Sequence, residues 1–287
     1  MPRFSLIIAT VERTIELERF LASLADQHYS DYEVIVIDQN DDNRLESILD
    51  EWLTNIPAHS RPLNLAHIRC QRGLSRARNR GLEVAKGEIV AFPDDDCWYA
   101  SDTLRTVDQW FAGHPKYHIL SVTAKDENGV RSGNRWVTQR CDLAGINIFR
   151  TTFSCAMFVR REDRSWILRF DETIGVGAGT SFGSGEDTDF VLRLMKQGMK
   201  GHFTSEWHVG HPCRDMLSGT VTTRRAAGYG AGMGHVLRKH SMPLLGSALV
   251  MYDFIRAGVV LVQGRRAAAA LSLAHGRGII SGYFAVE

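Results

Sequence analysis

The stretch GLSRARNRGLEVAKGEIVAFPDDDCWY, Gly73–Tyr99, decides the fold. Its first part, GLSRARNRGLEVAKG, is predicted to be a helix that Gly87 ends. Its second part is an apolar run typical of a buried strand, and it leads directly into three carboxylates, Asp94, Asp95 and Asp96. In open parallel sheets, ligands bind beyond the carboxyl ends of the strands. The stretch therefore predicts an α/β fold with polar chemistry at that edge.

The residues before this stretch show the same alternation of strand and helix. Buried strands are predicted for FSLIIAT (4–10), YEVIVIDQN (32–40) and NLAHIRC (64–70), and amphipathic helices for ELERFLASLADQ (16–27) and LESILDEWL (45–53). This βαβα order predicts a mainly parallel sheet. The strand ends Thr10, Asp38 and Asp94–Asp96 should then lie along one edge.

The rest of the chain gives a coarser pattern. A helix is expected over TLRTVDQWFAGHP (103–115), and mixed strands and loops up to Phe158. The glycine-rich loop GVGAGTSFGSG (175–185) precedes a helix over 186–198, a late strand over 203–209 and further helices. The segment YGAGMGH follows no predicted strand and lacks the G-x-G-x-x-G spacing, so its glycines indicate close packing of a helix or loop.

Composition and cysteine usage indicate an ordinary globular enzyme. Hydrophobic residues make up 44% and charged residues 23% of the 287 residues. The five cysteines contain no C-x-x-C pair, so a disulfide framework or a thiolate zinc site is not expected, and a reducing cytoplasm fits best. No targeting peptide is expected at the start of the sequence. The apolar stretch Leu244–Val262 is interrupted by Asp253 and Arg256, which argues against a membrane span.

The net charge of +1 hides an asymmetry along the chain. Residues 1–189 carry 22 Lys and Arg against 29 Asp and Glu, whereas residues 190–287 carry 12 against 4. A basic, partly amphipathic C-terminal third suits docking on anionic lipid or on a diphosphate-linked acceptor. An ordinary solvated basic face is the alternative. We therefore expect a cytoplasmic protein with peripheral attachment to the inner face of the cell membrane.

Two acidic groups can carry chemistry. Asp94, Asp95 and Asp96 follow an apolar strand, where carboxylates can hold a hard divalent cation that bridges the phosphates of a nucleotide. The alternative is a solvated acidic turn. Glu186 and Asp187 begin a helix, whose dipole favours ionised carboxylates, so one of them could be a general base. The alternative is helix capping, with Asp187 or Asp189 satisfying free backbone N–H groups.

Histidines and arginines give weaker signals. His208 and His211 follow the late strand, and an imidazole can add a nitrogen ligand to a cation already held by carboxylates; a structural, hydrogen-bonded histidine is the alternative. A cluster of arginines that could face nucleotide phosphates comprises Arg72, Arg76, Arg78 and Arg80. No glycine fingerprint follows the first strand and no G-x-x-x-x-G-K-[ST] occurs, which disfavours nicotinamide oxidoreductases and P-loop ATPases.

The ordered motifs SLIIAT, EVIVIDQN, GLSRARNRGLEVAKGEIVAFPDDDCWY and GSGEDTDFVLRLMKQG closely resemble family 2 glycosyltransferases of the GT-A fold, over residues 3–212. The tail from Thr222 resembles that of bacterial polysaccharide-assembly members. The resemblance implies a Rossmann-like, mainly parallel sheet flanked by helices, with a helical C-terminal appendage. It also implies a domain at 1–221, with a nucleotide-binding half (1–100) and an acceptor half (101–221), and a helical, basic region at 222–287.

The resemblance also implies roles for single residues. Contacts with the nucleotide-sugar donor are expected from Thr10, Glu12, Asp38 (to the base), Arg78, Asp94 and Asp95. Asp96 would hold a Mn²⁺ or Mg²⁺ ion, with His211, or else His208, completing the metal site. Asp187 would be the general base that deprotonates the acceptor hydroxyl, and Glu186 would orient the acceptor.

Four residues at three places in the chain depart from the family pattern. Val11-Glu12 replaces the common Tyr-Asn, Gln39 stands where another Asp is common, and Cys97 stands where many members have a fourth acidic residue. None of these changes removes a group that the family uses in catalysis. The contact with the base is therefore less well supported than the metal site.

The function that follows is an inverting transfer of a sugar from a nucleotide diphosphate-sugar to a hydroxyl acceptor. We expect a hexosyltransferase whose acceptor is a lipid-linked saccharide of bacterial surface polysaccharide biosynthesis. The alternatives are a catalytically silent scaffold that binds a nucleotide-sugar and a sugar-phosphate nucleotidyltransferase. Nucleic-acid binding is not expected, because the basic residues are not interleaved with an aromatic platform.

Overall fold

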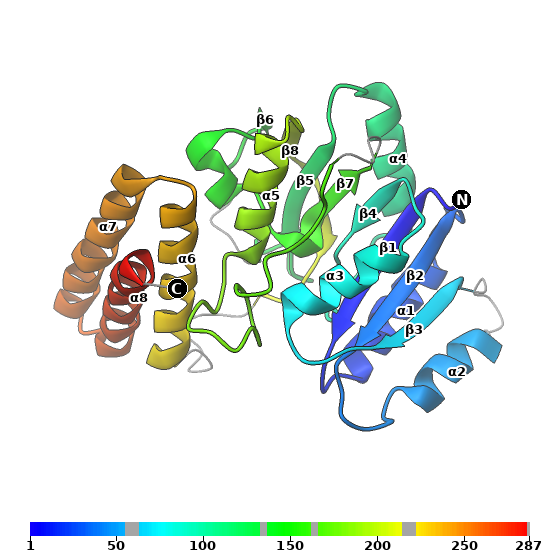
Figure 1. Cartoon of the computed structure of the whole chain (residues 1–287), viewed down its shortest axis with the longest axis horizontal. Coiled ribbons are helices and arrows are strands. Elements are labelled where there is room, and N and C mark those ends of the chain that lie inside the picture. The colour runs from blue at the N-terminus through cyan, green and yellow to red at the C-terminus, as the bar shows by residue number, and fades with distance from the viewer. Residues whose placement is uncertain (55–62, 133–136, 162–165, 214–221, 286–287) are drawn as a thin grey trace. The chain divides into compact units, whose positions relative to one another are not determined.

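The computed structural model describes residues 1–54, 63–132, 137–161, 166–213 and 222–285. Its strands are β1 (Phe4–Thr10), β2 (Tyr32–Asp38), β3 (Leu65–Arg69), β4 (Ile89–Ala91), β5 (Ile119–Lys125), β6 (Cys141–Asp142), β7 (Met157–Arg160) and β8 (Gly201–Gly210). Its α-helices are α1 (Ile15–Ala25), α2 (Glu46–Thr54), α3 (Leu74–Val84), α4 (Thr103–Gly113), α5 (Glu186–Lys196), α6 (Thr223–Lys239), α7 (Pro243–Val262) and α8 (Arg266–Phe284). Figure 1 shows their arrangement.

The strands form one sheet in the order β3-β2-β1-β4-β7-β5-β8-β6. The first four are parallel, as the βαβα pattern predicts. β7 runs antiparallel to its neighbours β4 and β5, while β5 and β8 are parallel to each other. The register pairs Thr10 with Asp38, and an isolated bridge pairs Ala9 with Asp94. The predicted polar strand ends are therefore neighbours at one edge of the sheet.

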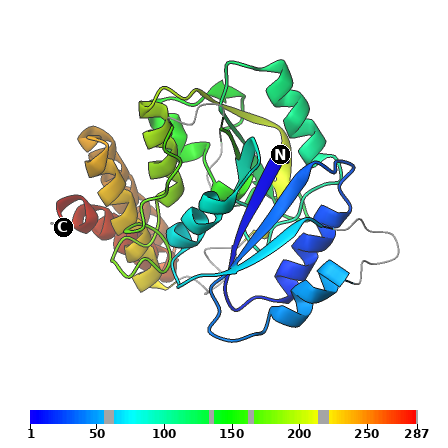
Figure 2. The same ribbon diagram turned by 45° about the vertical axis from the view of Figure 1, so that its right-hand side comes forward.

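Helices cover both faces of the parallel part of the sheet. Figure 2 shows α3 on one side of β1–β3 and α1 and α2 on the other. β2 is buried along its whole length, so its residues pack on both faces, which explains its uninterrupted apolar run. Gly81 of α3 lies against Ile7, where a Cβ atom would come within 2.2 Å of the isoleucine side chain. This glycine allows α3 to lie close to the sheet.

Two elements end earlier than the sequence pattern predicts. α3 ends at Val84, so Gly87 lies three residues beyond its end and does not cap it. An added Cβ on Gly87 would lie 2.4 Å from the backbone nitrogen of Ser5. Gly87 is small so that the chain can pass close to β1. The β4 ladder ends at Ala91, two residues before Pro93, which has no N–H group to donate. The carboxylates therefore lie on a turn rather than on the strand itself.

The chain packs as two compact units. The first comprises Met1–Arg72, Arg76–Arg169 and Arg193–Cys213 and contains the whole sheet. The second comprises Gly73–Ser75, Phe170–Leu192 and Arg214–Glu287, and so contains the glycine-rich loop, the start of α5 and helices α6–α8. The division into domains at 1–221 and 222–287 stays a prediction, because compactness alone does not define a functional domain.

In the second unit the glycines of YGAGMGH serve close packing, as predicted. An added Cβ on Gly230 or Gly234 would come within about 2 Å of a backbone carbonyl oxygen of α8 (2.0 and 2.1 Å). An added Cβ on Gly232 would lie 2.0 Å from the carbonyl oxygen of Ser184 in the glycine-rich loop. α6 is thus in backbone contact with α8 on one side and with the loop on another.

Candidate active site

The three carboxylates of the first unit lie on the turn after β4, beside the end of β1. The Thr10 hydroxyl donates to Asp95 Oδ2 over 2.8 Å. The Arg13 guanidinium contacts Asp95 Oδ1 at 2.5 Å and Asp96 Oδ2 at 2.7 Å. Burial raises the pKa of Asp95 to about 6, although the Arg13 charge and the Thr10 hydrogen bond act in the opposite direction. The acidic group is therefore a desolvated cluster with built-in positive charge, and the alternative of a solvated turn is wrong.

Asp94 is held by a different set of partners. Arg78, which is 2% exposed, donates to Ser154 Oγ over 2.7 Å and to Asp94 Oδ1 over 3.3 Å. Burial by itself would raise the pKa of Asp94, but the hydrogen bond from His211 and the Arg78 charge lower it below the usual value. Arg78 thus lies within the acidic group, where it adds to the effect of His211 in favouring the ionised form of Asp94.

His211 approaches the same carboxylates from β8. Its Nε2 atom lies 3.6 Å from Asp94 Oδ2 and 3.5 Å from Asp96 Oδ1. A β-bridge between Trp98 and Gly210 places His211, the next residue, beside the turn that carries the carboxylates. Only glycine fits at position 210, because an added Cβ would lie 2.0 Å from the Trp98 indole ring. The sequence neighbours of the carboxylates and of His211 are therefore locked together.

The hydrogen bonds of His211 fix its tautomer. Nδ1 lies 2.8 Å from the carbonyl oxygen of Pro212, which can only accept, and 2.8 Å from Ser132 Oγ. Nδ1 therefore carries a proton, and Nε2 is the atom that faces the carboxylates. Burial lowers the pKa of His211, but Asp94 and Asp96 raise it overall, so this ring attracts either a proton or a cation on Nε2.

These donors fit a divalent cation. One ligand atom from each of Asp94, Asp96 and His211 lies within 4.8 Å of the other two, which gives two oxygens and one nitrogen. This donor set suits Mn²⁺ or Mg²⁺, and the Nδ1 hydrogen bond to a backbone carbonyl is the outer-sphere contact typical of a metal-binding histidine. His208 lies on β8 beside Thr123 and belongs to no such group among the described residues.

Cys97 adds an unexpected neighbour to this group. The Cys97 sulfur, the Cys155 sulfur and a ring nitrogen of His211 all lie within 4.8 Å of one another. Both cysteines are fully buried. Burial raises the pKa of both thiols, which keeps them neutral. The position where many family members carry a fourth acid is therefore filled here by a small, uncharged side chain.

Two further residues predicted to contact the nucleotide, Glu12 and Asp38, lie at or just after the ends of the neighbouring strands β1 and β2. The Asp38 carboxylate is fully buried and accepts from the backbone N–H and the side chain of Asn40, at 2.8 and 2.7 Å, and it lies 3.0 Å from His67 Nε2. Asn40 Oδ1 in turn accepts from the backbone N–H of Glu12 at 2.7 Å. Glu12 has φ of 60°, a left-handed conformation that is uncommon for a residue with a side chain. A contact of Asp38 with a base stays a prediction.

The acidic pair of the second unit begins α5. Gly175, with φ of 109°, lies so close to Glu186 that an added Cβ would be 3.1 Å from its Oε2 atom. Asp187 is half-buried and accepts from the backbone N–H of Thr188 over 2.8 Å. This bond satisfies a backbone N–H in the first turn of α5, as the helix-capping alternative predicted for Asp187. Asp189 is fully buried and contacts His240 Nε2 at 2.8 Å and Lys239 Nζ at 3.0 Å. Asp187 and Glu186 as catalytic residues stay a prediction.

Several residues of this site gave no signal in the sequence. Arg13 could have been suspected from its place three residues after a strand end. Ser132 and Asn40 act through hydrogen bonds that only the fold creates, and His240 lies 51 residues from its partner Asp189. Long-range partners of this kind follow no periodicity that a single sequence shows.

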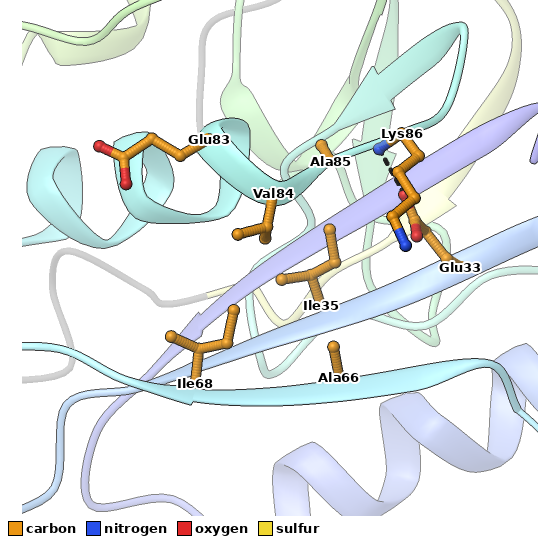
Figure 3. A pocket seen from close by; sticks show the side chains of 8 residues that line it. All are labelled: Glu33, Ile35, Ala66, Ile68, Glu83, Val84, Ala85 and Lys86. Atoms are coloured by element: carbon orange, nitrogen blue, oxygen red, sulfur yellow. Dashed lines mark hydrogen bonds between the residues drawn. The ribbon is translucent and has the colours of Figure 1, made fainter. Parts of the chain in front are cut away.

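A pocket of about 580 Å³ lies elsewhere in the first unit. Its lining comes from β2, β3 and the end of α3, and comprises Glu33, Ile35, Ala66, Ile68, Glu83, Val84, Ala85 and Lys86 (Figure 3). The backbone N–H of Lys86 donates to Glu33 across it. None of the predicted site residues lines this pocket, so it is not assigned to the active site.

Comparison with known protein families shows which proteins the chain resembles in sequence. A profile of the family described as Glycosyl transferase family 2 matches residues 5–164, more than half of the chain. An uncharacterized glycosyltransferase of Haemophilus influenzae is 28% identical over 196 residues, 67% of this chain and 62% of that protein. The GalNAc(5)-diNAcBac-PP-undecaprenol beta-1,3-glucosyltransferase of Campylobacter jejuni is 32% identical over 109 residues, 38% of this chain and 34% of that protein. The chain thus spans less than two thirds of the length of either relative.

Solved structures agree on the fold. The crystal structure of S. aureus TarS aligns with a TM-score of 0.60 and 17% identity over 97% of this chain and 90% of that chain. TarS has also been crystallised with UDP-GlcNAc. Mannosyltransferase PcManGT from Pyrobaculum calidifontis, in complex with GDP-Man and Mn²⁺, aligns with a TM-score of 0.60 and 17% identity over 99% and 87% of the two chains. These likenesses confirm the GT-A-like α/β fold with C-terminal helices.

Proposed function

Because the chain belongs to glycosyl transferase family 2, whose members transfer sugars from nucleotide-sugars, we propose that it is a metal-dependent, inverting hexosyltransferase. We further propose that its acceptor is a lipid-linked saccharide of bacterial surface polysaccharide assembly. The observation that carries the metal dependence is the group of Asp94, Asp96 and His211 at the strand edge, beside Thr10 and Asp38. Support for the donor comes from TarS, which binds UDP-GlcNAc, and support for the acceptor from the name of the Campylobacter jejuni relative.

The acidic group would hold the diphosphate end of the donor. When bound, a divalent cation supplies positive charge for the departing nucleotide diphosphate. Asp94, Asp96 and His211 Nε2 would be its ligands. The Arg78 guanidinium is buried beside Asp94, so it would add a fixed positive group that needs no reorganisation during the reaction. A leaving group stabilised in this way needs no protonated acid from the protein.

Asp187 would act on the acceptor. As an ionised carboxylate in the first turn of α5, it is stabilised by the helix dipole and remains able to accept a proton from a hydroxyl group. A hydroxyl that loses its proton as it attacks the anomeric carbon displaces the nucleotide diphosphate in one step, which inverts the configuration. Glu186, packed against Gly175, would hold a second acceptor hydroxyl.

The test is a panel of nucleotide-sugars with purified protein, with and without Mn²⁺ or Mg²⁺, followed by release of nucleotide diphosphate and NMR assignment of the product anomer. We expect turnover of one donor only with metal and with inverted configuration. Asp96→Asn should lose both metal binding and turnover, whereas Asp187→Asn should keep donor binding and lose about 10²- to 10⁴-fold in rate. Asp26→Asn, an exposed aspartate after α1, is the matched control and should behave as the parent.

Four outcomes would contradict the proposal or one part of it. Retained configuration would exclude the single displacement, and full activity of Asp187→Asn would exclude its role as base. Donor binding without any turnover, when lipid-linked and soluble acceptors are both supplied, would favour a silent nucleotide-sugar-binding scaffold. Activity on soluble saccharides alone would leave the transferase intact and exclude the lipid-linked acceptor.

A further inference from the structure

The C-terminal helix α7 exposes an apolar stripe. Its outward side chains recur about every fourth residue, with exposed fractions of 85%, 60%, 61%, 52% and 91% for Leu244, Met251, Ile255, Val259 and Val262. Residues at this spacing lie on one face of an α-helix. No charged residue lies among them, and Tyr252, Phe254 and Leu261 add exposed apolar area beside them. We call these five residues the α7 stripe.

The opposite face of α7 is already covered. Ala257 and Val260 pack with Ala268 and Ala269 of α8. The one charged group on this face, Asp253, is buried and contacts His275 Nδ1 of α8 over 2.5 Å. α7 is therefore apolar on two faces, one packed within its unit and the other facing outward. A soluble protein rarely leaves a contiguous apolar face of this kind without a partner.

The charge around the α7 stripe is positive and indicates which kind of partner would bind there. Residues 222–285 carry eight Lys and Arg and one acidic residue, the buried Asp253. Arg265 and Arg266 are exposed directly after the end of the stripe, and Arg256 is half-exposed beside it. Exposed apolar residues flanked by exposed arginines match the anionic surface of a lipid bilayer. A second copy of the chain fits less well, because pairing two such faces would bring like charges together.

We propose that α7 docks on anionic membranes by lying in the plane of the lipid headgroups with the α7 stripe buried. At 20 residues α7 is also long and apolar enough to cross a bilayer. Crossing is disfavoured because α8 packs along α7 and carries the exposed Arg266 and Arg277 (Figure 1). Moving the pair into hydrocarbon would bury these charges at high cost. The in-plane position leaves them among the headgroups.

The first experiment measures binding of the full chain to vesicles, without donor, acceptor or metal, so that its outcome is independent of the proposed catalysis. Vesicles contain phosphatidylcholine alone or with about a third phosphatidylglycerol. We expect binding only to the anionic vesicles, weakening as salt is raised. The double variant Met251→Glu/Ile255→Glu should bind at least roughly tenfold more weakly. The control Ile146→Glu/Ile167→Glu changes two exposed isoleucines of the first unit and should bind as the parent does.

A second measurement separates lying in the membrane from crossing it. Tryptophan introduced singly at Leu244, Met251 and Val262 is quenched by lipids brominated at different depths, relative to the unsubstituted protein. We expect similar, shallow quenching at all three sites. Deepest quenching at Met251, equal binding to neutral vesicles, or full binding by the Met251→Glu/Ile255→Glu variant would each overturn the proposal. A lipid-free dimer that this double variant dissociates would overturn it in favour of a second copy.

Discussion

Arg13 contacts two of the three adjacent carboxylates Asp94–Asp96, and its charge is the one that a bound cation would partly replace. Its guanidinium reaches both Asp95 and Asp96, which are 6% exposed. Burial lowers the pKa of Arg13, but the two carboxylates raise it overall. In the absence of a metal, Arg13 therefore compensates two buried negative charges.

Replacing Arg13 tests this compensation. Arg13→Met removes the positive charge beside Asp95 and Asp96. In the presence of a chelator we therefore expect a loss of about 2 kcal/mol in the free energy of unfolding. Added Mn²⁺ should raise the melting temperature more in the variant than in the parent. Arg44→Met, which breaks the exposed pair with Asp42, is the control and should cost less than about 0.5 kcal/mol. Equal responses of parent and Arg13→Met to Mn²⁺ would contradict this account.

Asp171 gives a prediction for acid stability. Burial alone would raise the pKa of Asp171, but hydrogen bonds from Lys239 Nζ, at 2.5 Å, and from Thr173 lower it below 3.8. A carboxyl group with a depressed pKa in the folded state stabilises the protein above its unfolded pKa and loses this effect as pH falls through the folded value. The difference in melting temperature between parent and Asp171→Asn should therefore be constant near neutral pH and shrink below about pH 4. A difference that grows on acidification would have the wrong sign.

The sequence indicated which residues make up the candidate metal-binding group, Asp94, Asp96 and His211, but little of what holds them in place. The carboxylates follow an apolar strand and His211 follows another, so position in the chain indicated both. Arg13 and Ser132 contribute through loops whose courses no periodicity determines. Asp38 was predicted to contact a base, yet its oxygens already bind Asn40 and His67, which a single sequence does not reveal.

At the scale of elements, the parallel strands of the first hundred residues were predictable, whereas β5, β6 and β7 were expected only as mixed strands and loops. β1 spans the predicted residues 4–10, because a strand buried on both faces gives a continuous apolar run. Glycines were harder to interpret. Gly87 was expected to end α3 and instead makes room for β1, since a glycine that allows close approach looks the same in sequence as one that ends a helix.

Two helical glycines provide a matched test of this distinction. Gly232 of α6 lies against the backbone of Ser184, whereas Gly258 of α7 has open space where a Cβ would be. Gly258→Ala should stabilise the protein by up to about 1 kcal/mol through helix propensity. Gly232→Ala gains the same propensity but must displace the glycine-rich loop, so we expect a net loss of about 1–3 kcal/mol. Thermal unfolding of both variants checks this, and equal stabilisation would show that the contact between α6 and the loop is not maintained.

At the scale of the whole molecule, the two units share continuous helices. α5 belongs to the second unit up to Leu192 and to the first from Arg193, and α3 begins in the second and continues in the first. A helix forms cooperatively, so melting half of one costs hydrogen bonds in the other half. We therefore expect the two units to unfold in a single cooperative transition.

Spectroscopy can follow each unit separately. The five tryptophans of the described residues lie in the first unit, at 52, 98, 110, 166 and 207, whereas the longest helices, α6, α7 and α8, lie in the second. We expect the midpoints of tryptophan emission and far-ultraviolet circular dichroism to coincide on heating. Gly232→Ala, a change in the second unit, should lower both midpoints equally. If only the circular dichroism transition moves, the units unfold independently and the shared helices do not couple them.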